Sequence, residues 1–89
     1  PLQGIRILDL TRLLPGPLGT MLMADMGAEV IKIESPNQPD YVRNFPPVYE
    51  VNNKEFSANY LAFNRSKISL SLDYTQPEGR EVFLELVKT

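Results

Sequence analysis

The chain has 89 residues, a formal net charge of −2 from nine basic and eleven acidic side chains, and neither cysteine nor histidine. This charge argues against a nucleic-acid-binding surface. The two missing residue types exclude a cysteine nucleophile, a histidine base and the usual zinc ligands within these residues, so we expect no metal. Because no run of 18 apolar residues is present, we also expect no membrane partner.

Residues 4–34 predict a strand, a tight turn, a helix and a second strand. The branched apolar run at 5–10 is typical of a buried strand. Pro15, Gly16 and Pro17 then favour a turn that leads into a helix, and Gly27 is placed to end that helix. The apolar face of the helix is predicted from three- and four-residue spacing of Leu18, Met21, Leu22 and Met26.

The second strand is predicted from Val30, Ile31 and Ile33, and it ends at Glu34. A β-α-β unit with parallel strands is the natural arrangement. Such a unit places the first turn at the carboxyl edge of the sheet, where helix N–H groups bind phosphates.

A dinucleotide site would require G-x-G-x-x-G in this turn, but only Gly16 and Gly19 are present. Glu34 stands where such enzymes place a ribose-binding acid. We favour the alternative that Gly16 serves the turn alone and that Glu34 faces solvent at a strand end.

Residues 35–57 are rich in proline and asparagine and predict a long irregular connection. Aromatic side chains in this segment indicate packing on its own domain or on a partner subunit; the alternative is a loop that covers substrate. These side chains are Tyr41, Phe45, Tyr49 and Phe56.

The remaining chain predicts a short helix, a third strand and a final helix. Ser57 is placed to cap the short helix, whose apolar side is formed by Tyr60, Leu61 and Phe63. The strand is predicted from alternation of Ile68, Leu70 and Leu72, with one buried face. Thr75 is placed to cap the last helix, whose apolar face would comprise Val82, Phe83, Leu86 and Val87. The predicted order is β-α-β-loop-α-β-α, an α/β fold.

Four blocks, LDLTRLLPGP, MADMGAEVIKIESP, NRSKISLSLD and TQPEGRE, closely resemble the amino-terminal segment of class III (CaiB/BaiF) CoA-transferases. That family includes formyl-CoA transferase, carnitine CoA-transferase and the α-methylacyl-CoA racemases. The resemblance covers essentially the whole chain. It implies that residues 1–89 form the amino-terminal part of a larger, Rossmann-like CoA-binding domain with a parallel sheet and flanking helices.

The resemblance also implies where CoA binds. The family positions that line the CoA site correspond to Leu14, Pro15, Ser35, Leu72, Asp73, Tyr74 and Thr75. The alternative is that these residues serve only as core, turn, cap and surface positions. Arg43, Arg65 and Lys67 are candidates for contact with a CoA phosphate, and an ordinary solvated surface is an equal alternative for them.

By the same resemblance, the protein moves CoA between an acyl-CoA and a carboxylic acid through an aspartate nucleophile that lies downstream of residue 89. No aspartate of this chain is expected to take that role. Leu14 and Ser35 replace a glutamine and an arginine of formyl-CoA transferase, which disfavours a formyl- or oxalyl-specific role. Alternatives are an α-methylacyl-CoA racemase and a non-catalytic CoA-binding or assembly module. The resemblance further implies an interlocked homodimer and a cytoplasmic location, mitochondrial or peroxisomal in a eukaryote.

Overall fold

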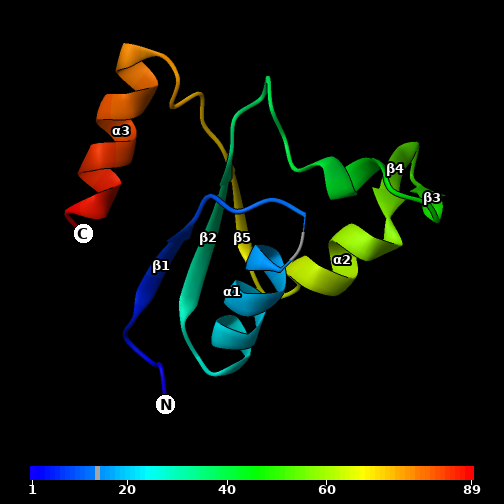
Figure 1. Cartoon of the computed structure of the whole chain (residues 1–89), viewed down its shortest axis with the longest axis horizontal. Helices are drawn as coiled ribbons and strands as arrows, with labels where there is room; N and C mark the ends of the chain where they lie inside the picture. The colour runs from blue at the N-terminus through cyan, green and yellow to red at the C-terminus, as the bar shows by residue number, and fades with distance from the viewer. Residues whose placement is uncertain (14) are drawn as a thin grey trace.

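A three-stranded parallel sheet lies at the centre of the computed structural model, which describes residues 1–13 and 15–89 (Figure 1). Strand β2 (Glu29–Glu34) is the middle strand and pairs with β1 (Arg6–Asp9) and β5 (Ile68–Ser71). Helix α1 (Gly16–Asp25) connects β1 to β2. The predicted β-α-β unit and the α/β class are confirmed.

The other two helices flank β5 in the sequence. Helix α2 (Ala58–Asn64) precedes β5 and packs beside α1, with Ser57 at its N-cap as predicted. Helix α3 (Pro77–Val87) follows β5 and lies apart from α1 and α2 (Figure 1). Its end is tied to the start of β1, because the Arg6 Nη1 atom donates a hydrogen bond of 2.7 Å to the Thr89 hydroxyl.

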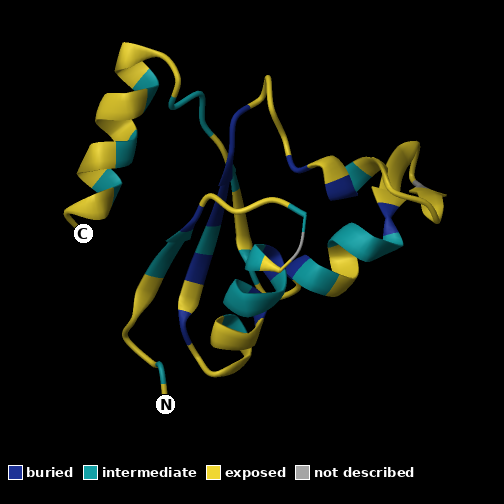
Figure 2. Ribbon diagram, in the orientation of Figure 1, coloured by how far each residue is buried: buried dark blue, intermediate teal, exposed yellow. Residues whose placement is uncertain are grey.

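The two faces of the sheet differ in chemistry. Strand register places Asp9 beside Lys32, and Lys32 beside Ser69, so these polar side chains share one face. Because side chains alternate along a strand, Ile31 and Ile33 point to the opposite face. The middle strand is the most buried part of the molecule, whereas α3 has no buried residue (Figure 2). The buried apolar side chains include Pro17, Met21, Ala28, Val30, Ile33 and Val42.

The prediction that residues 35–57 are irregular is wrong for their second half. A 3₁₀ helix, η1 (Tyr41–Asn44), is followed by an antiparallel hairpin of β3 (Val48–Val51) and β4 (Lys54–Ser57). The turn of the hairpin is Asn52-Asn53, and both residues have positive φ, of 53° and 64°. Asparagine tolerates this conformation, which a two-residue hairpin of the I′ type requires.

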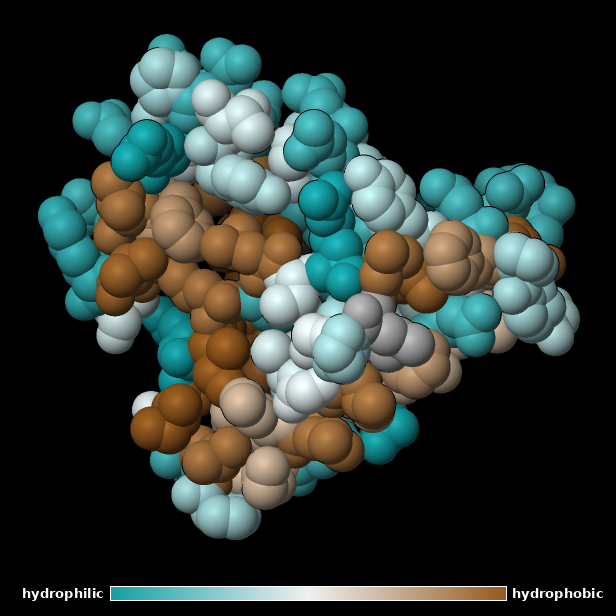
Figure 3. Space-filling model, in the orientation of Figure 1, coloured by the Kyte–Doolittle hydropathy of each residue, from teal (hydrophilic) through white to brown (hydrophobic). Residues whose placement is uncertain are grey.

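Two expectations about apolar faces are also corrected. Leu22 and Met26 of the first helical segment are more than two-fifths exposed, so only Met21 of that face is buried. Along α3, Val82 and Val87 are at least half exposed, and so is Ile68 of β5. Apolar side chains accordingly gather on the surface along α3 and the strands beside it (Figure 3).

Candidate functional site

The parallel strands bring the predicted CoA-binding positions to one edge of the sheet. Pro15 follows β1 as the N-cap of α1, and Ser35 follows β2 directly. Leu72 follows β5, and its amide donates a 3.0 Å hydrogen bond to the carbonyl oxygen of Glu34, so Leu72 lies beside Ser35. Leu14, the remaining position of the first turn, lies outside the described residues.

Ser35 is fully buried, and it forms part of the wall of a small cavity at this edge. The cavity has a volume of about 200 Å³ and is bounded by the ends of β2 and β5. Its lining comprises Glu34, Ser35, Pro36, Pro39, Arg43, Ser69, Leu70 and Ser71. Of the predicted CoA-binding residues that the structure describes, Ser35 alone lines this cavity, and the segment after β5 begins just beyond its wall at Ser71.

The segment after β5 forms a turn held by its own side chains. The Asp73 carboxylate accepts hydrogen bonds from the backbone amide of Thr75, at 3.2 Å, and from the Thr75 hydroxyl. Gln76, not Thr75, is the N-cap of α3, so the predicted capping role of Thr75 is wrong. The hydroxyl of Thr75 donates to Asp73 in the turn before the helix and does not cap the helix. Tyr74, between these two residues, is half-buried.

The first of two buried ion pairs joins β2 to the segment that follows it. The Lys32 Nζ atom lies 2.7 Å from the Asp40 Oδ2 atom, with side-chain exposures of 1% and 0%. Lys32 also donates to the carbonyl oxygen of Thr11, at 3.2 Å. The Asp40 Oδ1 atom accepts from the amides of Leu13, at 2.9 Å, and Val42, at 3.0 Å. Burial raises the pKa of Asp40, but the Lys32 and backbone hydrogen bonds outweigh burial and lower it.

The second pair, Lys67–Asp9, has a separation of 2.9 Å and is equally buried. Lys67 also donates to the carbonyl oxygen of Pro17, at 3.0 Å, while Asp9 accepts from the amide of Thr11, at 2.8 Å, and from the Thr20 hydroxyl, at 2.7 Å. Burial lowers the pKa of Lys67, and its pairing with Asp9 offsets part of that effect. Lys67 is therefore neither a solvated surface group nor free to meet a phosphate.

A third cluster surrounds Glu34, which is 7% exposed and does not face solvent as expected. Arg43 binds both of its carboxylate oxygens, at 2.7 and 2.9 Å, and the Tyr60 hydroxyl donates to it at 3.2 Å. The Arg43 guanidinium lies 3.9 Å from the centre of the Tyr60 ring. Burial and the Glu34 carboxylate raise the pKa of Tyr60 to about 12. Because Arg43 binds both carboxylate oxygens of Glu34, this carboxylate is not available to bind a ribose hydroxyl.

The third basic candidate, Arg65, forms an exposed ion pair of 2.7 Å with Asp25. Of the three predicted phosphate-binding residues, it alone has a mostly exposed side chain, at 58%. Within the described part of the chain, no group of three or more candidate ligands could hold a metal ion. No helix of that part is long and apolar enough to cross a membrane.

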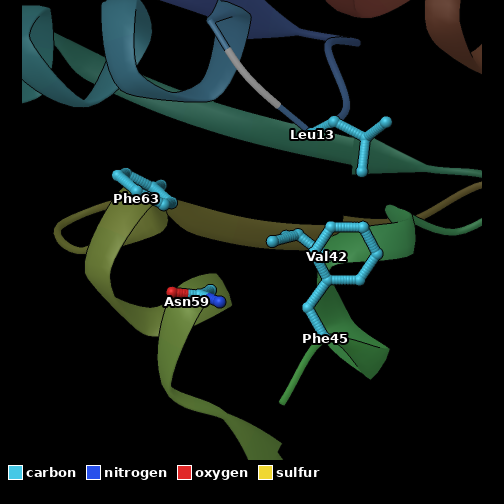
Figure 4. A pocket seen from close by; sticks show the side chains of 5 residues that line it. All are labelled: Leu13, Val42, Phe45, Asn59 and Phe63. Carbon is cyan, nitrogen blue, oxygen red and sulfur yellow. The ribbon is translucent and has the colours of Figure 1, made fainter. Parts of the chain in front are cut away.

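An apolar pocket that the sequence did not reveal lies between the first turn, η1 and α2 (Figure 4). Its volume is about 350 Å³, and its lining residues are Leu13, Val42, Phe45, Asn59 and Phe63. Leu13 faces Val42 and Phe45 across this space, while Asn59 and Phe63 come from α2 (Figure 4). Leu13 has a φ of 61°, a left-handed conformation that leucine seldom adopts. Three separated segments form the pocket, so no single block of sequence indicates it.

The sequence profile described as CoA-transferase family III matches residues 2–89. The chain belongs to CoA-transferase family III. It is 45% identical over 86 residues to a mouse succinyl-CoA:glutarate CoA-transferase, covering 97% of this chain and 19% of that protein. It is 47% identical over 88 residues to a Haloarcula hispanica succinyl-CoA:mesaconate CoA-transferase, covering 98% and 22%.

Solved structures of the family have the same fold. A CaiB/BaiF family protein from Brucella suis matches with a TM-score of 0.86 and 39% identity, covering 98% of this chain and 23% of that one. The Rv3272 protein of Mycobacterium tuberculosis matches with a TM-score of 0.78 and 35% identity over 97% and 22%. This family III segment thus spans about a fifth of the length of the relatives it matches.

Proposed function

We propose that the protein containing this segment is a class III CoA-transferase, and that residues 1–89 form the amino-terminal part of its CoA-binding domain. The observation that supports this most strongly is the family match over residues 2–89, with relatives above 40% identity that are named as CoA-transferases. The chemistry needs a site for the CoA thioester and a site for a carboxylic acid. The protein is proposed to act as a homodimer in the cytoplasm, or in mitochondria or peroxisomes of a eukaryote.

The proposed CoA contacts are Pro15, Ser35, Leu72, Asp73, Tyr74 and Thr75, together with Leu14. Support comes from the shared sheet edge, where backbone amides at the start of α1 and α3 are available to an anion. The cavity beside Ser35 connects the ends of β2 and β5 at the same edge. The described side chains supply little positive charge there, because Lys67 and Arg43 are both paired with carboxylates.

The proposed reaction proceeds through an aspartate outside residues 1–89. Its carboxylate attacks the acyl-CoA carbonyl and expels CoA thiolate, which leaves an aspartyl–acyl anhydride. The thiolate then attacks the aspartyl carbonyl, which forms an aspartyl-CoA thioester and releases the donor acid. The acceptor carboxylate attacks that thioester, and return of the thiolate to the new acyl carbonyl yields the product and frees the aspartate.

The environments of two aspartates of this segment support placing the nucleophile elsewhere. Asp9 and Asp40 are fully buried, and each is bound by a lysine and by at least one backbone amide. A carboxylate held in this way is a poor nucleophile, because attack would break several charge-assisted hydrogen bonds.

The test uses the full-length protein with succinyl-CoA and either glutarate or mesaconate, the substrates for which the relatives are named. Hydroxylamine is added during turnover, and the protein is digested and analysed by mass spectrometry. An aspartyl hydroxamate that depends on succinyl-CoA is expected. Absence of that adduct, with exchange of the substrate α-hydrogen for solvent deuterium, would instead identify a racemase. Neither signal across a panel of acyl-CoAs would leave a non-catalytic CoA-binding module.

A further inference from the structure

The buried ion pairs converge on the first turn from both sides. Lys32 binds the carbonyl oxygen of Thr11, at 3.2 Å, and Lys67 binds that of Pro17, at 3.0 Å. Asp9 and Asp40, their partners, accept from the amides of Thr11 and Leu13, at 2.8 and 2.9 Å. Both ends of residues 11–17 are therefore anchored to side chains that are almost fully excluded from solvent.

This anchoring coincides with an unfavourable backbone conformation. Leu13 has a φ of 61°, and a residue with a Cβ atom is strained in this region. Such a conformation persists only where the surroundings fix it, and here the Asp40 carboxylate binds the Leu13 amide directly. Because its amide is fixed in this way, Leu13 places its side chain at the wall of the apolar pocket.

Stability alone is a weak explanation for two buried ion pairs. Burying a charged pair costs desolvation energy that its attraction often fails to exceed, and apolar side chains of the same volume are commonly as stable. Apolar replacements, however, would not bind the carbonyl oxygens of Thr11 and Pro17 or the amides of Thr11 and Leu13. The polar groups are suited to fixing a backbone, which is what a ligand-binding turn needs.

We propose that Lys32–Asp40 and Lys67–Asp9 are positioning pairs, which hold the first turn in the shape that binds the CoA thioester. This inference rests on the proposed function and extends it, because none of the four side chains need contact the substrate. Asp40 acts through the Leu13 amide and Lys32 through the Thr11 carbonyl oxygen. Asp9 and Lys67 secure the two ends of the same turn.

The test compares steady-state kinetics of variants in the full-length protein, together with thermal unfolding. Asp40→Asn removes the charge that orients Lys32 and is expected to raise KM for acyl-CoA about tenfold, while kcat at saturation changes far less. The double variant Lys32→Met/Asp40→Asn leaves no unpaired buried charge, so it should fold even if the single variant does not. It lacks the bond to Thr11 and is also expected to show a raised KM.

Val30→Ala is the matched control, since Val30 is 1% exposed in the same strand, where it pairs with Ile7, and its side chain has no polar group that could bond to the turn. It should lower the unfolding temperature and leave KM for acyl-CoA unchanged. A KM within about twofold of wild type in the folded Asp40 variants would overturn the proposal. So would an equal rise in KM for Val30→Ala, because that would mark a general effect of stability. Wild-type protein that neither binds CoA nor transfers it would refute the proposed function, and the positioning role with it.

Discussion

Replacing Lys32 by methionine tests how strongly the buried pair depends on its countercharge. Methionine nearly keeps the length of the lysine stem but removes the ammonium group, so the Asp40 carboxylate loses its 2.7 Å partner. Asp40 is fully buried and cannot recover that interaction from water. Removing one partner of such a pair costs about 3–5 kcal/mol.

An exposed ion pair in the same chain is the reference for the size of this effect. The Arg65–Asp25 pair has a similar separation of 2.7 Å, but its side chains are 58% and 34% exposed. Breaking it with Arg65→Gln is expected to cost no more than about 1 kcal/mol, because water screens and replaces the interaction. The ion pairs that the two variants break therefore have the same N–O distance but differ in how deeply they are buried.

Native-state hydrogen exchange in the full-length protein measures both effects locally. The informative amides are those of Leu13 and Val42, which donate to Asp40. Their opening free energies should fall by about 3 kcal/mol or more in Lys32→Met, and the double variant Lys32→Met/Asp40→Asn should recover part of the loss. A loss below about 1 kcal/mol in Lys32→Met, or none regained in the double variant, would refute the reasoning.

Three further outcomes are expected. In alkaline titration, the difference in phenolate absorbance between wild type and Tyr60→Phe should show a pKa of about 12, and a midpoint near the ordinary value of 10 would contradict the buried Tyr60–Glu34 contact. Gly79→Ala should reduce CoA affinity in calorimetry, because a Cβ atom there would lie 1.8 Å from the Asp73 carbonyl oxygen and displace the turn; unchanged affinity would remove that turn from the site. Three buried carboxyls have lower pKa values in the folded state than in the unfolded state. The stability that they contribute is therefore fully present above their unfolded-state pKa values, near 4, and is lost as the pH falls through their folded-state pKa values. The urea midpoint should therefore drop between pH 7 and about pH 3, and a flat profile would contradict these shifts. These carboxyls are Asp9, Glu34 and Asp40.

The sheet and its first crossover were predictable because their signals are local. Val30, Ile31 and Ile33 mark a strand by themselves, and Gly27, with a φ of 105°, ends the preceding helix as predicted. The hairpin at 48–57 had a local signal too, the Asn52-Asn53 pair between alternating residues. The prolines nearby concealed it, although they precede β3 instead of interrupting it.

The buried polar network was not predictable, because several of its bonds join segments distant in the sequence. Lys67 and Asp9 are separated by 58 positions, and nothing near either residue indicates the other. Lys32 gave the one available signal, since a lysine inside the apolar run of a buried strand requires a partner. The partner, Asp40, lies beyond the strand in a segment whose path follows from tertiary contacts.

The alternation along β2 has a consequence for how the strands find their pairing. Val30, Lys32 and Glu34 face one side of the sheet, and Ile31 and Ile33 face the other. A shift of β2 by one residue would move Lys32 and Glu34 to the face that carries Leu8, Ile68 and Leu70, and it would leave Asp40 without Lys32. Misaligned chains would thus carry several unpaired charges at once, which gives the assembling sheet an internal check against incorrect pairing.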